Sequence, residues 1–353
     1  MEVTEKIIVI QTAFLGDLIL TFPLLRWVKK AYPSAEVTLV CRKGLASLFK
    51  NYSLVNKIFE VDKKNKNYSQ IASQIKENFD LLLCPHPSFS TALMAKRIKA
   101  RKKIGFKNWW NFWAYDLRPQ KNLKWPEAVR LLQLLSTESE ELKKNLIQFE
   151  DSYLGEILSD GQLTDVPVWA DFFENENPPP KVFNRAAIFP GSVWKTKQWT
   201  EEGFRELVKA LCQRGYEVHL LGSDSERDLC QRIANSDQCV NWAGRLNLPE
   251  SLEILKKCDF AVTNDSGGQH MASLVQIPVV SIFGPTVLQL GFRPWNSNSL
   301  VVQDLTLGCR PCGAHGHQEC PLQHHKCMKN IKMHEVLTAC LSLRENREVD
   351  HSI

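Results

Sequence analysis

The sequence predicts an α/β protein with two domains of similar build, each a parallel sheet covered by helices. Three observations predict this fold class. Apolar, β-rich runs alternate with helical patterns over the first 84 residues, and the same alternation begins again near residue 185. Between them lies an acidic stretch that ends in three prolines at 178–180, which suit neither a helix nor a central strand. A chain of 353 residues is long enough for two such domains.

Turn signals and hydrophobic periodicity place the individual elements. In the first half we expect strands at 6–11, 36–41, 57–61 and 79–84, with helices at 18–32, near 44–51 and near 67–78. A basic helix then follows His86-Pro87-Ser88, and a helix at 126–150 leads out of the domain. In the second half we expect strands at 185–189, 217–221, 239–241, 260–263 and 278–283, and helices at 200–214, 224–234, 249–257 and 270–275.

These elements define the expected domain boundaries. The N-terminal domain should cover residues 1–170, a proline-rich linker 171–182, and the C-terminal domain 183–335. Residues 336–353 should form a C-terminal helix and tail that packs back on the N-terminal domain. We expect a cleft between the domains, because ligand pockets concentrate at domain interfaces.

The stretch 258–286 carries the strongest local signal. It has the pattern strand, glycine turn, helix, strand, which is a βαβ unit. Gly267 and Gly268 allow backbone N–H groups to approach a ligand, and the helix that follows has a partially positive N-terminus. This combination predicts an anion site, most simply for a phosphate. Asp265 is either a ligand-binding carboxylate at the end of a strand or a plain helix cap.

Charge is distributed unevenly along the chain. Residues 1–130 hold 23 Lys and Arg against 10 Asp and Glu, a net charge of +13, whereas residues 131–177 hold 2 against 11, a net charge of −9. A basic half indicates an anionic partner, or a solvated surface. Within it, basic residues at 96–107 precede aromatic residues at 109–115, a composition that suits nucleic acid or a membrane surface equally. Part of this aromatic cluster can also be core.

Composition favours a globular protein. No apolar run approaches the length of a membrane-spanning helix, and the N-terminal residues lead into a strand without a signal-peptide pattern, so we expect a cytoplasmic protein. Eleven cysteines in such a compartment are mostly buried thiols, or metal ligands where they cluster. One such cluster allows a tetrahedral structural zinc site, with packed thiols as the alternative: Cys309, Cys312, Cys320 and Cys327.

Several loops are expected to carry the chemistry. Gly16-Asp17 follows the first strand, and Gly191 to Lys197 follows the first strand of the second half. Lys195 and Lys197 can neutralise a diphosphate, and Glu226 follows a strand, where a carboxylate can accept ribose hydroxyls. The motifs GxGxxG and GxxxxGK[ST] are both absent, which argues against a dehydrogenase and a P-loop NTPase.

Several ordered motifs resemble those of the ADP-heptose:lipopolysaccharide heptosyltransferases, glycosyltransferase family 9, and in particular the heptosyltransferase II branch. The resemblance covers nearly the whole chain. It rests on residues 14–20, on Pro190-Gly191-Ser192 with 197–199, on 263–267 with 270–272 and 283–286, and on the cysteine-rich tail at 309–328. It implies a GT-B fold of two Rossmann-like domains with parallel sheets facing a central cleft.

The resemblance also implies an inverting transfer of heptose from ADP-L-glycero-D-manno-heptose to the Kdo or heptose inner core of lipopolysaccharide. Asp17 would be the general base, and no metal or other cofactor would be required for catalysis. Donor binding would fall to Ser192, Lys197, Glu226, Asp265, Ser266, Gly267, Gly268 and His270, although a structural role is an equal alternative for His270. The acceptor, or the membrane, would contact Lys96, Arg97, Arg101, Lys102 and Lys103.

The acceptor in this family is an anionic, lipid-linked saccharide, so we expect a peripheral enzyme at the inner face of the cytoplasmic membrane, with no nucleic-acid partner. Two alternatives share some of these features. Another GT-B transferase with a different nucleotide sugar would share most of these motifs. A zinc- and nucleic-acid-binding protein would use the basic residues and the cysteines, but it would leave Asp17, Lys197 and the stretch 263–286 without a role.

Overall fold

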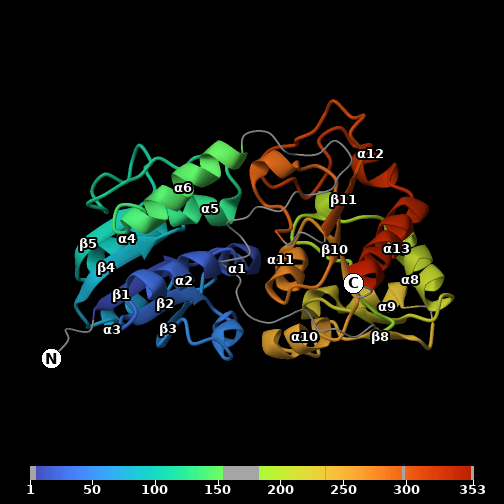
Figure 1. The fold of residues 1–353 in the computed structure, drawn as a ribbon, viewed down its shortest axis with the longest axis horizontal. Coiled ribbons are helices and arrows are strands. Elements are labelled where there is room, and N and C mark those ends of the chain that lie inside the picture. Colours follow the sequence, from blue (N-terminus) through green and yellow to red (C-terminus); the bar gives the residue numbers. More distant parts are fainter. Residues whose placement is uncertain (1–4, 154–182, 235, 296–298, 351–353) are drawn as a thin grey trace. The chain divides into compact units, whose positions relative to one another are not determined.

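The computed structural model describes residues 5–153, 183–234, 236–295 and 299–350 (Figure 1). The chain divides into two compact units, unit 1 (Met1–Leu154) and unit 2 (Gly155–Ile353). Each is an α/β unit built on its own parallel sheet, as the sequence predicts. The predicted linker at 171–182 lies outside the described residues.

The unit 1 sheet has the strand order β3-β2-β1-β4-β5, and every neighbouring pair is parallel. Four of its strands are confirmed where the sequence predicts them, to within one residue: β1 (Lys6–Gln11), β2 (Glu36–Arg42), β3 (Lys57–Val61) and β4 (Phe79–Cys84). The fifth, β5 (Ala100–Gly105), was not predicted. It lies in the basic stretch, and as an edge strand it keeps charged side chains that a central strand would not tolerate.

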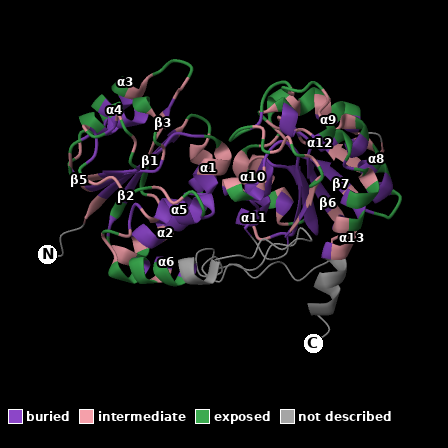
Figure 2. Cartoon of the chain, turned by 90° about the horizontal axis from the view of Figure 1, so that it is seen from above, coloured by how far each residue is buried: buried purple, intermediate pink, exposed green. Residues whose placement is uncertain are grey.

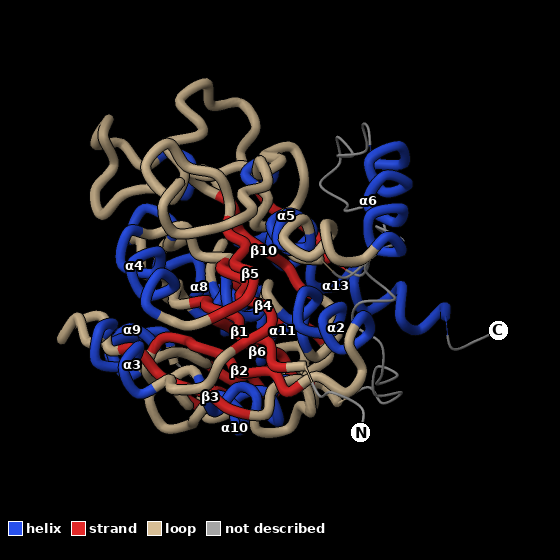
Figure 3. Tube along the Cα trace, turned by 90° about the vertical axis from the view of Figure 1, so that its left-hand side faces the viewer, coloured by secondary structure: helices blue, strands red, loops and turns tan. Residues whose placement is uncertain are grey.

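Helices cover both faces of this sheet. In Figures 2 and 3, α3 (Tyr68–Gln74) and α4 (Phe89–Arg97) lie on one face, and α2 (Phe22–Ala31), α5 (Glu127–Leu132) and α6 (Glu140–Tyr153) on the other. A short α1 (Leu15–Ile19) connects β1 to α2, and a 3-10 turn, η1 (Ala46–Phe49), follows β2. The buried strands lie between the helices of each unit and carry its apolar core (Figure 2).

Two helices of unit 1 that the sequence predicts as continuous are each divided into two. The helix expected at 18–32 is divided between α1 and α2, with Pro23 in the first turn of α2. The helix expected at 126–150 is likewise divided, because α5 ends at Leu132 and α6 begins at Glu140. Ser139 accepts a hydrogen bond from Leu142 N at 3.2 Å, so its side chain satisfies a backbone donor at the start of the second helix.

The unit 2 sheet has six parallel strands in the order β11-β10-β9-β6-β7-β8. Five are confirmed near their predicted positions: β6 (Arg185–Phe189), β7 (Glu217–Leu220), β8 (Cys239–Asn241), β9 (Phe260–Asn264) and β10 (Val279–Phe283). The edge strand β11 (Ser299–Gln303) was not predicted. Since β9 and β10 are neighbours, the stretch 258–286 forms the βαβ unit expected of it.

The helices of unit 2 enclose its sheet. One side holds α8 (Glu201–Cys212), α9 (Arg227–Ile233) and α13 (Met333–Asp350), whose apolar residues share a core cluster with the strands. The other side holds α10 (Leu248–Leu255) and α11 (Gly267–Leu274). The described side chains of α13 pack on α8 and the sheet of unit 2. Contact of the tail with unit 1 stays a prediction.

No helix among the described residues combines the length and the apolar character that crossing a membrane requires.

Candidate functional site

The carboxyl ends of β6, β9 and β10 bring three segments of unit 2 together. Asn264, at the end of β9, is fully buried. Its Nδ2 donates to Pro190 O at 2.8 Å, and its Oδ1 accepts from Trp199 N at 2.9 Å. One buried amide therefore fixes both ends of the loop at 190–199 against the strand that precedes α11. The sequence motif contained Asn264, but its structural role was not predicted.

A buried polar network lies beside this loop. Lys197 Nζ is 2.6 Å from Asp265 Oδ2, and the hydroxyl of Thr286 donates to the same oxygen at 2.6 Å. The amide of Gln269 donates to Asp265 Oδ1 at 3.1 Å and to Phe292 O at 3.0 Å. Both carboxylate oxygens of Asp265 are thus engaged within the protein. This arrangement makes Asp265 the anchor of Lys197, while its predicted contact with heptose hydroxyls stays a prediction.

The N-terminus of α11 faces the same edge of the sheet. Ser266 and Gly267 are half-buried, and the helix begins at Gly267, three residues earlier than predicted. Gly268 packs so tightly on the ring of Phe189 that an added Cβ would lie 2.6 Å from it. The first-turn N–H groups of such a helix have no intrahelical acceptors and carry partial positive charge. Half-buried Ser192 and exposed Lys195 lie on the loop that follows β6, the strand next to β9, so the predicted anion site at this edge stays a prediction.

His270 lies inside this helix with 3% of its surface exposed. Burial lowers its pKa to about 4, which outweighs the opposing effect of Asp265, so the ring is neutral at pH 7. It packs edge-on against Trp295 at 6.1 Å between ring centroids, and its Nδ1 has no hydrogen-bond partner within the described residues. These observations favour the structural alternative for His270. Its predicted contact with the donor phosphate stays a prediction.

Glu226 bridges two strand ends in unit 2. Its Oε2 accepts from Ser223 N at 2.7 Å and from the Ser223 hydroxyl at 2.8 Å. Its carboxylate also packs against Gly191, where an added Cβ would lie 1.7 Å from Oε1. Any side chain at residue 191 would therefore displace Glu226. Glu226, which the sequence assigned to ribose, is therefore in contact with the loop that carries Ser192 and Lys197.

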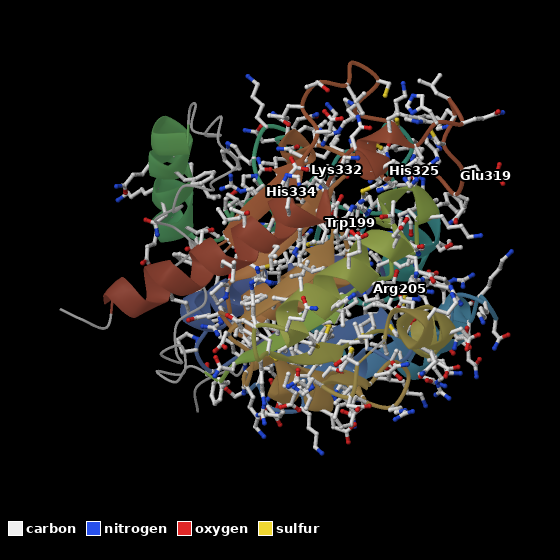
Figure 4. All side chains as sticks on the ribbon, turned by 90° about the vertical axis from the view of Figure 1, so that its right-hand side faces the viewer. Trp199, Arg205, Glu319, His325, Lys332 and His334 are labelled. Atoms are coloured by element: carbon white, nitrogen blue, oxygen red, sulfur yellow. The ribbon has the colours of Figure 1, made fainter. Side chains whose placement is uncertain are left out.

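The cysteine-rich segment 304–331 braces these loops. Thr196 exchanges hydrogen bonds with the backbone of His317, donating to its O at 2.7 Å and accepting from its N at 2.8 Å. The ring of His325 bonds Thr196 O at 2.8 Å, and Arg310 donates to Thr286 O at 2.7 Å. Figure 4 labels His325, together with Trp199 from the loop that it supports. The segment thus holds the loop at 190–199 and the turn after β10 in fixed positions.

The structure does not form the zinc site that the cysteine spacing allowed. Within the described residues, which include all four cysteines, no three His, Cys, Asp or Glu side chains are arranged to hold a metal ion. The Cys312 thiol instead donates to Cys309 O at 3.2 Å, and Cys327 is buried in the core cluster of unit 2 beside Met328. Although Cys327 is buried, its thiol still lies near enough to Cys309, Cys312 and Cys320 to interact electrostatically with them, so the four cysteines gather without the arrangement of a metal site.

In unit 1, the first loop places Asp17 at the carboxyl end of β1. Asp17 lies in the first turn of α1, and its Oδ2 accepts from Phe14 N at 3.2 Å. Burial, together with the nearby Glu127, raises the pKa of this half-buried carboxyl to about 6. A carboxylate with a pKa in this range is suited to accept a proton near neutral pH.

Cations from three other segments at this edge of the sheet lie around Asp17. Arg42 Cζ is 4.9 Å and Lys63 Nζ 5.9 Å from the centre of the exposed Phe14 ring. Lys63 and Lys121 both interact electrostatically with Asp17, and Lys121 Nζ is 2.5 Å from Glu127 Oε1. No local pattern predicts these residues, because they lie at or after the carboxyl ends of β2, β3 and β5 and meet only when the sheet forms.

His86 belongs to the same edge of the sheet. Its Nδ1 is 3.0 Å from the hydroxyl of Thr12, and burial, with contributions from Lys63 and Lys121, lowers its pKa to about 4. It is therefore neutral at pH 7. A neutral imidazole can orient a hydroxyl, but it adds no charge to this site.

The predicted acceptor-binding residues are not gathered around Asp17. Lys96 and Arg97 end α4, and Arg101 is near the start of β5, so all three lie at the amino ends of the parallel strands. Asp17 follows the carboxyl end of β1, at the opposite edge. Lys102 Nζ is 2.6 Å from Glu138 Oε1, and Lys103 Nζ donates to Ala95 O at 2.8 Å. Lys102 and Lys103 are therefore committed to contacts within unit 1.

Residues 69–324, well over half of the chain, match the family model of glycosyltransferase family 9 (heptosyltransferase). The chain belongs to this family. The resemblance seen in the sequence is therefore confirmed, and this member of the family is a glycosyltransferase.

Lipooligosaccharide heptosyltransferase 2 of Campylobacter jejuni is 25% identical to this family member, across 97% of this chain and 99% of its own. Two solved structures share the fold over nearly their whole length. ADP-heptose LPS heptosyltransferase II of E. coli has a TM-score of 0.72 at 22% identity, covering 97% of this chain and 99% of its own. E. coli heptosyltransferase WaaC with ADP has a TM-score of 0.69 at 17% identity, covering 96% and 99%. The fold is GT-B.

Proposed function

We propose that this glycosyltransferase is an inverting heptosyltransferase. It moves L-glycero-D-manno-heptose from ADP-heptose to a Kdo or heptose residue of the lipopolysaccharide inner core. The observation that carries the proposal is Asp17: a carboxyl with a pKa near 6, at the carboxyl edge of the unit 1 sheet and surrounded by cations, in a chain of this family. The fold it shares with WaaC, solved with ADP, supports the choice of donor nucleotide.

The reaction is a single displacement. Asp17 accepts the proton of the acceptor hydroxyl as that oxygen attacks C1 of the heptose, and the bond between C1 and the diphosphate oxygen breaks. Attack from the face opposite the leaving group inverts the anomeric centre. Lys63, Lys121 and Arg42 place positive charge near the base, where they attract an acceptor that carries carboxylates or phosphates.

The leaving ADP gains negative charge as it departs. In unit 2, Lys197, Ser192 and the N–H groups at the start of α11 provide fixed donors for the diphosphate, and Glu226 accepts the ribose hydroxyls. Asp265 keeps the Lys197 ammonium in place through a 2.6 Å contact. These groups come from the chain itself, and the proposed mechanism routes no step through a metal.

The acceptor of such a reaction is lipid-linked, so we place the enzyme at the inner face of the cytoplasmic membrane. A second candidate is a GT-B transferase that uses another nucleotide sugar. Incubation with ADP-heptose, UDP-sugars and GDP-sugars in parallel separates the two, since only ADP-heptose should be consumed in the presence of a truncated lipid A core.

The decisive experiment measures the mass of the acceptor after incubation with ADP-heptose. Wild-type protein should add one heptose, and Asp17→Ala should add none while it still binds ADP. Asp228→Ala, which removes an exposed carboxylate from α9, is the matched control and should behave like wild type. Turnover by Asp17→Ala would refute the base assignment, and no transfer by wild type to any core would refute the function.

A further inference from the structure

Helix α4 of unit 1 presents an outward face of mixed character. Phe89 and Leu93 are 62% and 38% exposed, and Lys96 and Arg97 follow on the same side of the helix. These positions are i, i+4, i+7 and i+8, the spacing of a single helical face. The buried residues of α4 face the sheet, so the exposed ones form a stripe on the outer side of the helix, where Arg97 also donates to the hydroxyl of Ser69.

Aromatic residues extend this stripe at its N-terminal end. The Phe89 ring lies 5.6 Å from Trp110 and 5.9 Å from Trp113, which are half-buried against the core. Trp109 and Phe112, in the same loop, are 88% and 66% exposed. Four of the ten large hydrophobic side chains that are exposed in the described residues therefore belong to 89–112. Clustered exposed aromatics of this kind mark an interaction surface.

The other end of the stripe is basic. A surface hollow of about 500 Å³ opens at the amino ends of β4 and β5. Lys96, Lys99 and Arg101 are exposed there and form no ion pair with any described residue. The charged side chains that line the hollow are five cations and a single carboxylate: Lys96, Arg97, Lys99, Arg101, Lys103 and Asp80.

We propose that the face formed by α4, the loop 106–113 and the basic hollow docks the protein on an anionic lipid bilayer. The aromatic side chains enter the headgroup region, where large amphipathic rings are favoured, and the cations contact lipid phosphates. Charge complementarity decides the occupant, because a face with unpaired cations at one end and exposed tryptophan at the other matches a phospholipid interface. Lys96, Arg97 and Arg101 were predicted to contact either the acceptor or the membrane, and this proposal assigns them to the membrane.

Docking in this way has a consequence for the site in unit 1. The loop 106–113 follows the carboxyl end of β5, at the same edge of the sheet as Asp17. A bilayer that contacts the loop therefore lies at the edge where the acceptor hydroxyl must arrive. This consequence rests on the proposed function, but the docking itself does not.

The test is vesicle co-sedimentation of the full chain with neither donor nor acceptor present, so its outcome does not depend on catalysis. Wild type should bind vesicles of phosphatidylethanolamine with phosphatidylglycerol, and not vesicles of phosphatidylcholine alone. Binding should weaken strongly as salt rises from about 0.05 to about 0.5 M, because screening shortens the range of the attraction. Equal binding to both kinds of vesicle would overturn the charge argument.

Two variants address the two ends of the face. Lys96→Gln/Lys99→Gln/Arg101→Gln should lower vesicle affinity on the order of 100-fold, since each cation near an anionic surface contributes about a fivefold factor. Trp109→Ser/Phe112→Ser should also lose binding. The matched controls are Lys50→Gln/Lys64→Gln/Lys209→Gln and Leu305→Ser/Leu322→Ser, which change exposed residues elsewhere and should bind like wild type.

Affinity for ADP, measured in parallel, should be the same in all variants and shows that each is folded. Normal vesicle binding by the glutamine variant, with a raised KM for a water-soluble deacylated acceptor, would return these residues to the acceptor site and overturn the proposal. Loss of self-association by Trp109→Ser/Phe112→Ser in sedimentation velocity, without any change in vesicle binding, would identify a second copy of the chain as the occupant and also overturn it.

Discussion

Lys197 Nζ lies 2.6 Å from Asp265 Oδ2 in the interior of unit 2, and the two side chains are only 11% and 4% exposed. A buried pair of this kind is stable only as a pair, because removing one partner leaves the other charge without compensation. Here the pair joins the loop after β6 to the residue that follows β9, so that one contact fixes both sides of the proposed diphosphate site.

The first prediction concerns this pair. Lys197→Met should destabilise unit 2 by about 3 to 5 kcal/mol, because Asp265 then remains buried beside a methyl group. Lys197→Met/Asp265→Asn should recover most of that loss, since the amide carries no charge and still bonds Thr286. Urea unfolding of wild type, the single variants and the double variant measures the coupling. Additive effects of the two substitutions would contradict it.

Asp17 predicts a pH dependence of activity. Its pKa is raised to about 6, and a general base must be deprotonated, so kcat/KM should rise through about pH 6 and then level off. Asp17→Asn should lower kcat on the order of 10²- to 10⁴-fold and abolish this acid limb. A pH–rate profile checks both, and an unchanged acid limb in the variant would assign the titration to another group.

The raised pKa that suits Asp17 to act as a base also makes the folded protein less stable at high pH. The folded protein binds the Asp17 proton more tightly than the unfolded chain does, so this group lowers the free energy of unfolding as pH rises from about 4 to above 6. Asp17→Asn should therefore unfold at higher urea than wild type at pH 8. The gain should be about 1 kcal/mol, since partial exposure screens much of the ~3 kcal/mol that the full shift represents. The difference should narrow at pH 5.

Lys121 and Glu127 provide a pair of variants with opposite signs. Glu127 raises the pKa of Asp17, whereas Lys121 lowers it. Lys121→Met should therefore move the acid limb of kcat/KM to higher pH, and Glu127→Gln should move it to lower pH. Shifts in the same direction would show that Asp17 does not set the limb. Lys124→Met, in the same loop and exposed, serves as the control and should leave the limb in place.

Local sequence motifs correctly placed the segments that we propose for the donor site. The loop at 190–199 and the stretch 258–286 each follow a buried strand, so their position at the carboxyl edge of the sheet follows from the parallel topology. Asp17 was found in the same way. The sequence did not distinguish a carboxylate open to a sugar from one engaged on both oxygens, because that depends on Thr286 and Gln269 packing from separate segments.

The residues around Asp17 show what local patterns miss. Arg42, Lys63 and Lys121 are among many cations in a basic half, and only the strand order β3-β2-β1-β4-β5 selects those three. The stretch 100–105 shows the converse. Its consecutive lysines look like a charged helix or a binding patch, yet it forms an edge strand, because β5 pairs with β4 through backbone groups. The side chains of Lys102 and Lys103 then bond other residues of unit 1.

The last prediction tests whether the segment 304–331 positions the donor loop. Thr196 holds this segment through two side-chain hydrogen bonds with the backbone of His317, at 2.7 and 2.8 Å. Thr196→Val keeps the shape and removes both bonds, which costs about 1 to 3 kcal/mol and loosens the loop that carries Ser192 and Lys197. The expected result is a donor KM that rises on the order of 10-fold, with a smaller change in kcat, since the hydroxyl has no role in proton transfer.

Thr306→Val is the matched control, because among the described residues its hydroxyl bonds only Asp304, within the same segment, at 2.6 Å. Steady-state kinetics at saturating acceptor separates the two variants. An equal rise in donor KM for both would show a general loss of stability, and no rise for Thr196→Val would show that the loop keeps its position without the segment.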